Sequence, residues 1–173
     1  MNDLNHFSVP YKGLGSGEHH LEFIVESDFF NAFEGSHITN GSFEIQVSLD
    51  KRYDHSILQF DINGTTKTSC DRCLADIDLP LIGNFELLVK HGEKEDSNDE
   101  IMFIHPETSI LNLAQVIYEF ILLSMPMIKV YDCHTEEKSP CNVQVLDKLE
   151  DEETQKSNQA SVWDSLKNID FKE

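Results

Sequence analysis

The chemistry available to this chain begins at two cysteines, Cys70 and Cys73, which stand in a C-x-x-C spacing. A tight turn of this kind can supply two of the four ligands of a tetrahedral zinc site. It can also form a thiol redox pair, or simply hold two thiols with no shared role. The redox pair requires its first cysteine at a helix N-terminus, where the helix dipole lowers the thiol pKa. No helical pattern follows Leu74, so the sequence disfavours a thioredoxin-type role.

The other soft ligands gather in one later stretch that contains Cys133, His134 and Cys141. A structural zinc site would combine Cys70 and Cys73 with Cys141 and with either Cys133 or His134. Seven residues separate Cys133 from Cys141, which is wider than a standard zinc knuckle. Zinc ligands and unligated thiols therefore both remain open interpretations of these cysteines.

The chain shows none of the familiar catalytic motifs. It contains no G-x-S-x-G, no H-E-x-x-H and no glycine-rich phosphate loop. Glu119 is the one carboxylate in the apolar stretch before Pro126, and no second acid or base accompanies it there. The sequence predicts a protein that is not an enzyme.

Composition predicts a folded and strongly acidic protein. The 173 residues carry a net charge of -19, with 39% hydrophobic residues and eleven Phe. Such a charge repels phosphate backbones over most of the surface, so RNA would be met through one limited face or through a basic partner. Residues 1–17 lack the pattern of a secretory signal, and the apolar stretch 110–130 is interrupted by polar residues and Pro126. We expect a cytoplasmic protein with no membrane span, in a compartment that keeps cysteines reduced.

The elements that must position the cysteines are predominantly strands. Alternation is clearest at Phe43, Ile45, Val47 and Leu49, which predict the buried face of one strand. Asn63-Gly64 predicts a tight hairpin turn, after which a short separate strand would lead to Cys70. Pro80 and Gly83 predict a bend or bulge beyond the cysteine turn. The expected strands of this antiparallel meander are 21–26, 43–49, 56–62, 65–69, 76–81, 84–91 and 101–104.

One long apolar helix is expected from Ile110 to Ser124, capped by Thr108 or Ser109 and ended by Pro126. Its apolar positions extend nearly all round, so it should lie buried across one sheet face. The fold class predicted is α+β, an antiparallel β-meander packed against one long apolar helix, with a short C-terminal helix. The expected organisation is an irregular lead-in at 1–20, a core domain at 21–148 with the exposed acidic loop 92–100, and at 149–173 an acidic linker with a short helix around Trp163.

The stretch Cys70-Asp71-Arg72-Cys73-Leu74 resembles the C-x-R-C-L signature of the YceD family, the large-subunit ribosomal RNA accumulation proteins. The order of features is also similar, because an apolar helix ending in Leu-Leu-Ser-Met-Pro and a cysteine-bearing loop follow the motif. Residues 162–169 resemble the family's closing helix, although Ala160-Ser161-Val162 stands where many members have D-P-R. Many members also carry a second C-x-x-C-like cluster, and this chain has only Cys133, His134 and Cys141 there.

The resemblance implies a non-enzymatic factor that supports large-subunit ribosomal RNA accumulation and ribosome assembly. Its partner would be precursor ribosomal RNA or a basic ribosomal protein, and the acidic surface favours the protein. Arg72 and Trp163 are the residues expected to contact that partner. The alternative is a zinc-stabilised structural module with no RNA role.

Overall fold

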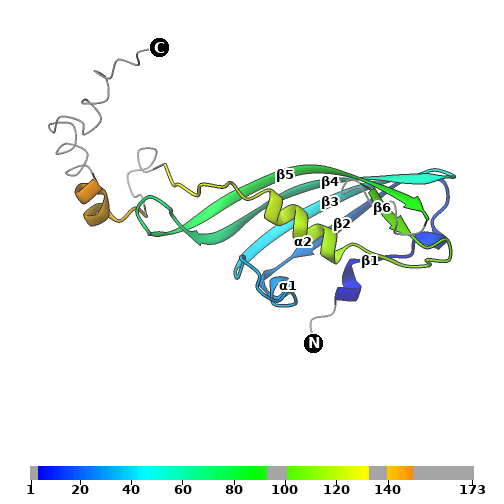
Figure 1. The fold of residues 1–173 in the computed structure, drawn as a ribbon, viewed down its shortest axis with the longest axis horizontal. Helices are drawn as coiled ribbons and strands as arrows, with labels where there is room; N and C mark the ends of the chain where they lie inside the picture. Colours follow the sequence, from blue (N-terminus) through cyan, green and yellow to red (C-terminus); the bar gives the residue numbers. More distant parts are fainter. Residues whose placement is uncertain (1–3, 93–100, 133–139, 150–173) are drawn as a thin grey trace, which may run out of the picture.

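The computed structural model describes residues 4–92, 101–132 and 140–149 of the chain. A five-stranded sheet dominates it, with the strand order β2-β3-β4-β5-β6 (Figure 1). Neighbouring strands are antiparallel from β2 to β5, which confirms the predicted meander, and β6 runs parallel to β5. The strands are β2 (Gly17–Val25), β3 (Gly41–Lys51), β4 (His55–Ser69), β5 (Asp76–His91) and β6 (Ile101–Ile104).

Shorter elements surround this sheet. Strands β1 and β7 pair with each other as a separate two-stranded sheet, and residues 143–149 are helical. In Figure 1 helix α2 crosses one face of the large sheet, while α1 and β1 lie near its β2 edge. These elements are η1 (Leu4–Phe7), β1 (Ser8–Val9), η2 (Tyr11–Gly13), α1 (Ser27–Phe30), β7 (Leu111–Asn112) and α2 (Ala114–Leu123).

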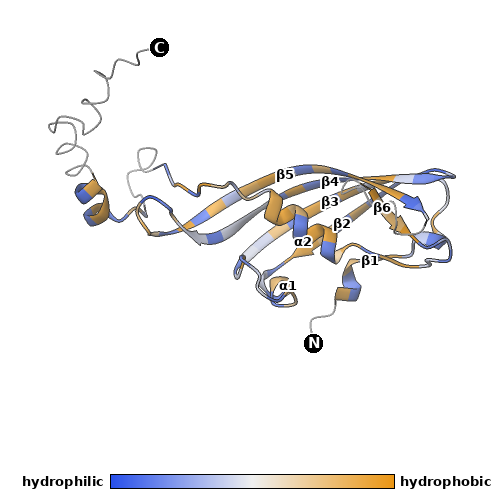
Figure 2. Ribbon diagram, viewed as in Figure 1, coloured by the Kyte–Doolittle hydropathy of each residue, from blue (hydrophilic) through white to orange (hydrophobic). Residues whose placement is uncertain are grey.

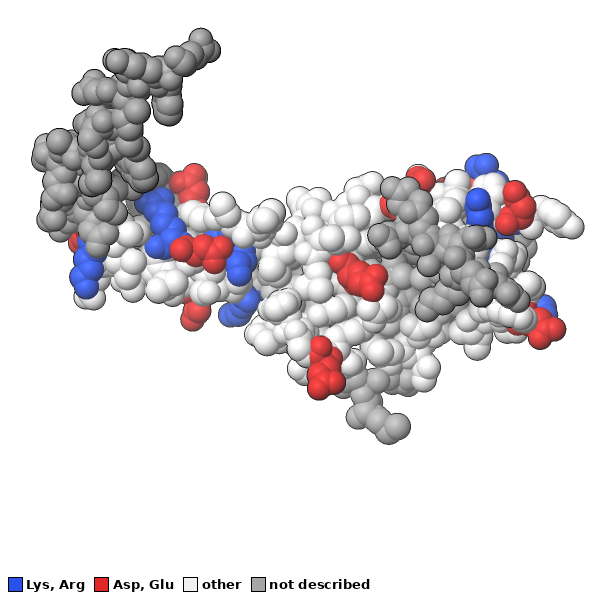
Figure 3. All heavy atoms as spheres, viewed as in Figure 1, with Lys and Arg blue, Asp and Glu red and all other residues white. Residues whose placement is uncertain are grey.

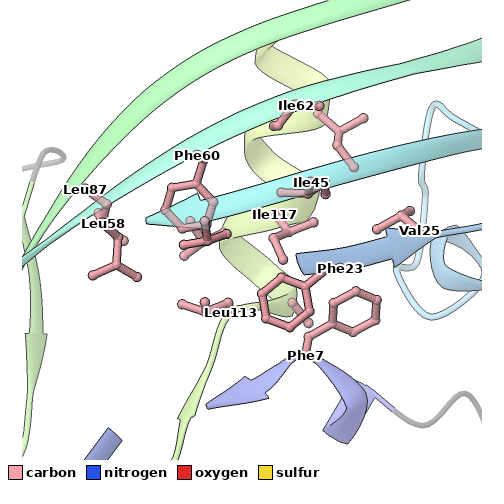
Figure 4. Close-up of a cluster of buried hydrophobic side chains, with 14 of the residues drawn as sticks. Phe7, Phe23, Val25, Ile45, Leu58, Phe60, Ile62, Leu87, Leu113 and Ile117 are labelled. Carbon is pink, nitrogen blue, oxygen red and sulfur yellow. The ribbon is translucent and has the colours of Figure 1, made fainter. Parts of the chain in front are cut away.

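The core lies between the inner face of the sheet and α2. Phe43, Ile45, Val47 and Leu49 are all buried, as their alternation predicts, because successive side chains of a strand point to opposite faces. Figure 2 shows the apolar residues of α2 and of the strands, and Figure 4 shows Ile117 of α2 among side chains from the strands and η1. The fold is therefore α+β, with its main apolar core between the sheet and α2.

The helix is shorter than predicted. Residues 111–112 form β7 and α2 begins only at Ala114, so the helix has ten residues. Asn112 explains the difference, because its Nδ2 donates to the carbonyl of Leu4 at 2.8 Å and its Oδ1 accepts from the Ala114 N–H at 2.9 Å. The first of these bonds ties the chain to its N-terminal region, and the second gives the helix start a side-chain partner in place of Thr108 or Ser109.

The predicted hairpin turn at Asn63-Gly64 is wrong. Strand β4 runs without a break to Ser69, and Gly64 stands opposite Phe43 of β3. A Cβ atom at residue 64 would lie only 2.7 Å from Phe43 Cα and would also overlap the Phe43 ring. Close packing against the neighbouring strand requires a glycine here. In the sequence, a glycine needed for packing looks the same as a glycine needed for a tight turn.

No bulge occurs at Pro80 or Gly83, because both residues lie inside the continuous strand β5, whose pairing with β4 keeps one register throughout. Pro80 pairs with Thr65 on one side, while β6 pairs with β5 only from Leu88 onward. The missing N–H of proline is therefore tolerated on an open stretch of sheet edge. Gly83 makes room for Ser124 at the end of α2, since a Cβ there would overlap the Ser124 side chain.

These corrections leave one long hairpin of β4 and β5, whose connecting turn is Cys70–Ala75. Strand β3 begins at Gly41, opposite Thr66, so the last residues of the hairpin extend beyond β3 (Figure 1). Within the described ranges, no helix is long and apolar enough to span a membrane. Residues 93–100 of the expected acidic loop and residues 150–173, with Trp163, lie outside the described residues.

Candidate functional site

The C-x-x-C motif forms the closed turn at the end of the β4–β5 hairpin. The Cys70 N–H donates to the Ala75 carbonyl at 2.8 Å, and the Leu74 N–H donates back to the Cys70 carbonyl at 2.9 Å. Leu74 has a φ of 59°, and it is the only residue other than glycine with a positive φ among the described residues. A leucine held in the left-handed region is uncommon and strained, so the closed turn imposes its shape on this residue.

The two thiols point inward and form a small second core. Cys70 and Cys73 are fully buried beside Ile77, apart from the main core. Tyr131, Cys141 and Leu146 from the C-terminal part of the chain pack against this cluster. The fold therefore brings Cys141 to the C-x-x-C turn, as the zinc interpretation requires.

The environment of Cys70 favours its thiolate form. Burial raises the pKa of this thiol, but hydrogen bonds from the backbone N–H groups of Tyr131, Cys73 and Arg72 and from the Cys73 side chain lower it. The net pKa of Cys70 lies below its ordinary value. Hydrogen-bond donors around a buried sulfur stabilise its negative charge, whether the sulfur is a free thiolate or a thiolate bound to a metal.

A polar latch fixes the segment after α2 to this turn. The Asp71 N–H donates to the Lys129 carbonyl at 2.7 Å, and the Lys129 N–H donates to Asp71 Oδ2 at 2.7 Å. The Lys129 ammonium lies 3.9 Å from Asp71 Oδ1. The second residue of the motif thus positions a residue 58 places further along the chain.

The outer side of the turn presents Arg72 and Leu74 to solvent, and Leu74 is 71% exposed. Sequence reasoning singled out Arg72 and missed Leu74. Its place as the last letter of C-x-R-C-L was the available signal, but a leucine in a sequence gives no sign of positive φ or of exposure. Arginine is one of the residue types enriched among those that carry the binding energy of protein interfaces.

The zinc interpretation is only partly covered by the described residues. Cys70 and Cys73 are free thiols, whereas Cys141 is disulfide-bonded in this structure. Across residues 4–92, 101–132 and 140–149, no three His, Cys, Asp or Glu side chains converge closely enough to hold a metal ion. Cys133 and His134, the remaining predicted ligands, lie outside the described residues, as does Trp163.

Basic residues are found at the hairpin end despite the overall negative charge. Arg72 lies in the turn, Lys67 lies near the end of β4, and Lys129 is latched to Asp71. In the view of Figure 3, blue patches of Lys and Arg appear at this end among a few red ones, while the middle of the molecule shows white and red only. The exposed carboxylates Asp71, Asp76 and Asp78 lie at the same end, so the end of the hairpin carries both signs of charge.

Comparison with known proteins assigns the family. Curated proteins and solved structures give no match to this chain. A family model described as "Large ribosomal RNA subunit accumulation protein YceD" matches residues 58–170, which is more than half of the chain. The match begins inside β4 and includes the whole cysteine turn, α2 and the latched segment. The chain belongs to the YceD family.

Proposed function

We propose that this protein is a non-enzymatic, cytoplasmic factor for large-subunit ribosome assembly that binds precursor ribosomal RNA or a basic ribosomal protein. The family's name supports the link to large-subunit ribosomal RNA accumulation. The observation that supports binding is the rigid presentation of Arg72 and Leu74 at the hairpin end. Both side chains are exposed, and the closed turn and the buried thiols below them fix their backbone.

Rigidity matters because association costs the freedom of every side chain that becomes ordered. A contact residue on a preorganised turn loses less entropy on binding than one on a mobile loop. Arg72 can donate to phosphate oxygens or to a carboxylate and backbone carbonyls of a protein, so it suits either partner. The acidic body would add favourable electrostatics toward a basic ribosomal protein.

Capture from cell lysate tests this function. The tagged full-length chain should recover large-subunit components, and Arg72→Glu should recover less of them because it reverses the charge at the contact. Treatment with ribonuclease separates the two partners, since RNA-dependent recovery is lost and protein-dependent recovery persists. Recovery of no large-subunit component with or without ribonuclease would contradict the proposal.

One observation favours a second role for the cysteines, a structural zinc site. Cys70, Cys73 and Cys141 share one small buried cluster, and the lowered pKa of Cys70 suits a thiolate ligand. The zinc form would have the Cys141 disulfide reduced and would take its fourth ligand from Cys133 or His134. Such a site would hold the C-terminal segment against the hairpin turn, whether or not the protein binds RNA.

A further inference from the structure

A groove of about 400 Å³ lies between the end of β4 and the segment that follows α2. It is open to solvent and lies next to the latch between Asp71 and Lys129. Its lining includes His37, Lys67, Thr68, Met125, Met127 and Lys129.

The charge of this groove differs from the charge of the whole chain. Its lining contains two lysines and a histidine and no Asp or Glu. Two other grooves of similar size each contain three carboxylates and one basic residue. These are Glu26, Asp28 and Asp78 with Lys67, which lines both grooves, in one, and Glu18, Asp50 and Glu86 with Arg52 in the other. In a protein of net charge -19, an anion would enter the lysine groove with the least electrostatic penalty of the three.

Both lysines are held in place by hydrogen bonds of their backbones. The Lys67 N–H donates to the Asn40 carbonyl at 3.0 Å, and the Lys129 backbone exchanges two hydrogen bonds with Asp71. The Lys129 side chain is 28% exposed, and its ammonium lies 3.9 Å from Asp71 Oδ1. A single contact of this length leaves further N–H donors of the ammonium for another acceptor. The hydroxyl of Thr68 adds a further possible donor on the same wall.

We propose that this groove binds the phosphate backbone of a single RNA strand through Lys67 and Lys129. The inference rests on the proposed function and names RNA as the partner at this site. A groove of about 400 Å³ has the size of a small-ligand pocket, which suits a phosphate and its sugar and is too small for a duplex. Met127, which is 99% exposed, offers a flexible apolar surface against which a base or sugar can pack.

The motif then has a positioning role in this binding. Asp71 is not among the residues that line the groove, but it fixes the backbone of Lys129 and so sets one wall of the groove. The C-x-R-C-L turn would thus serve RNA binding twice, through the exposed Arg72 and through the wall that Asp71 holds.

Fluorescence anisotropy with a labelled single-stranded RNA of about 20 nucleotides tests the groove, with the full-length chain titrated at several salt concentrations. The variant Lys67→Gln/Lys129→Gln should weaken binding by about tenfold or more at low salt. The slope of log K against log salt should fall in magnitude by about 1.4, because each phosphate contact to a single strand contributes about 0.7. Lys12→Gln/Lys90→Gln is the matched control, since it removes the same charge away from the groove and should change the slope much less.

Two results would overturn the inference. One is unchanged affinity and unchanged slope in the groove variant, and the other is equal loss in the control variant, which would show a general charge effect. If the unmodified chain binds no RNA while lysate capture still recovers a large-subunit protein, the groove inference fails and the proposed function stands in its protein form. Preference for an RNA duplex over the single strand would also contradict it.

Discussion

Asp71 and Lys129 are joined by two hydrogen bonds of 2.7 Å, one from the Asp71 N–H to the Lys129 carbonyl and one from the Lys129 N–H to Asp71 Oδ2. This pair joins the C-x-x-C turn to the segment that follows α2. A carboxylate that accepts from a backbone N–H does so without needing a charged partner, and the reciprocal bond fixes the register of the two segments. The hairpin end is therefore a composite of two distant parts of the chain.

The latch predicts a local effect of Asp71→Ala. Loss of the carboxylate leaves the Lys129 N–H without its acceptor, and we expect unfolding to become easier by about 1 kcal/mol, since the Asp71 side chain is partly exposed. Hydrogen exchange should show a faster amide at Lys129 while amides of β3 keep their protection. Asp76→Ala removes a carboxylate from the same hairpin end and serves as the control. Unchanged exchange at Lys129 would show that the latch contributes nothing in solution.

Close packing at Gly64 predicts a cost for the smallest possible addition. Gly64→Ala places a methyl group against the backbone of Ser42 and Phe43, which cannot move without shifting β3. We expect a loss of about 1–3 kcal/mol in urea unfolding. Gly15→Ala is the control, because a Cβ at residue 15 meets nothing within 4 Å. Equal stability of the two variants would contradict the assigned pairing of β3 and β4.

The position of α2 on the sheet predicts that substitutions on its buried side cost more stability than substitutions on its exposed side. Ile117 is fully buried against the sheet, so Ile117→Ala should cost about 2–5 kcal/mol through lost burial and a residual cavity. Leu123 is 69% exposed on the same helix, and Leu123→Ala should change stability by no more than about 0.5 kcal/mol. Chemical denaturation of the two variants side by side checks the orientation of the helix, and a larger loss at Leu123 would reverse it.

The cysteine cluster predicts a metal content that depends on Cys70. Protein purified under reducing conditions should carry about one zinc ion per chain if Cys70, Cys73 and Cys141 act with a fourth ligand. Cys70→Ser should lose the metal, while Ser69→Ala, a neighbouring change outside the cluster, should keep it. Elemental analysis gives the stoichiometry, and a value near zero in the unchanged protein would remove zinc from the account.

Much of the fold follows from local patterns, and the exceptions share one physical cause. The alternation of Phe43, Ile45, Val47 and Leu49 identifies a buried strand face without any knowledge of its neighbours. Gly64 and the helix start are different, because Phe43 fills the space at Gly64 and the Leu4 carbonyl binds Asn112, and these partners are distant in sequence. Turn and helix propensities describe a residue and its near neighbours, so tertiary contacts of this kind override them.

The candidate site likewise has features that the sequence predicts and features that only the fold reveals. The C-x-x-C spacing and Arg72 are visible in the sequence, and the structure places both at one hairpin end. The groove is not visible in the sequence, because Lys67 and Lys129 are far apart in the chain and only the fold brings them to one groove. The number of lysines in an acidic sequence does not reveal which of them will line the same groove, or that this groove will contain no Asp or Glu.

The most direct test of the central claim is the ratio of large-subunit to small-subunit ribosomal RNA in cells that lack this protein. We expect this ratio to be lower than in cells that contain the protein. Expression of the unchanged chain should restore it, and Arg72→Glu expressed at the same level should restore it less. The variant should remain folded, because Arg72 is exposed and its backbone bonds do not depend on its side chain. A ratio that stays the same when the protein is removed would contradict the account.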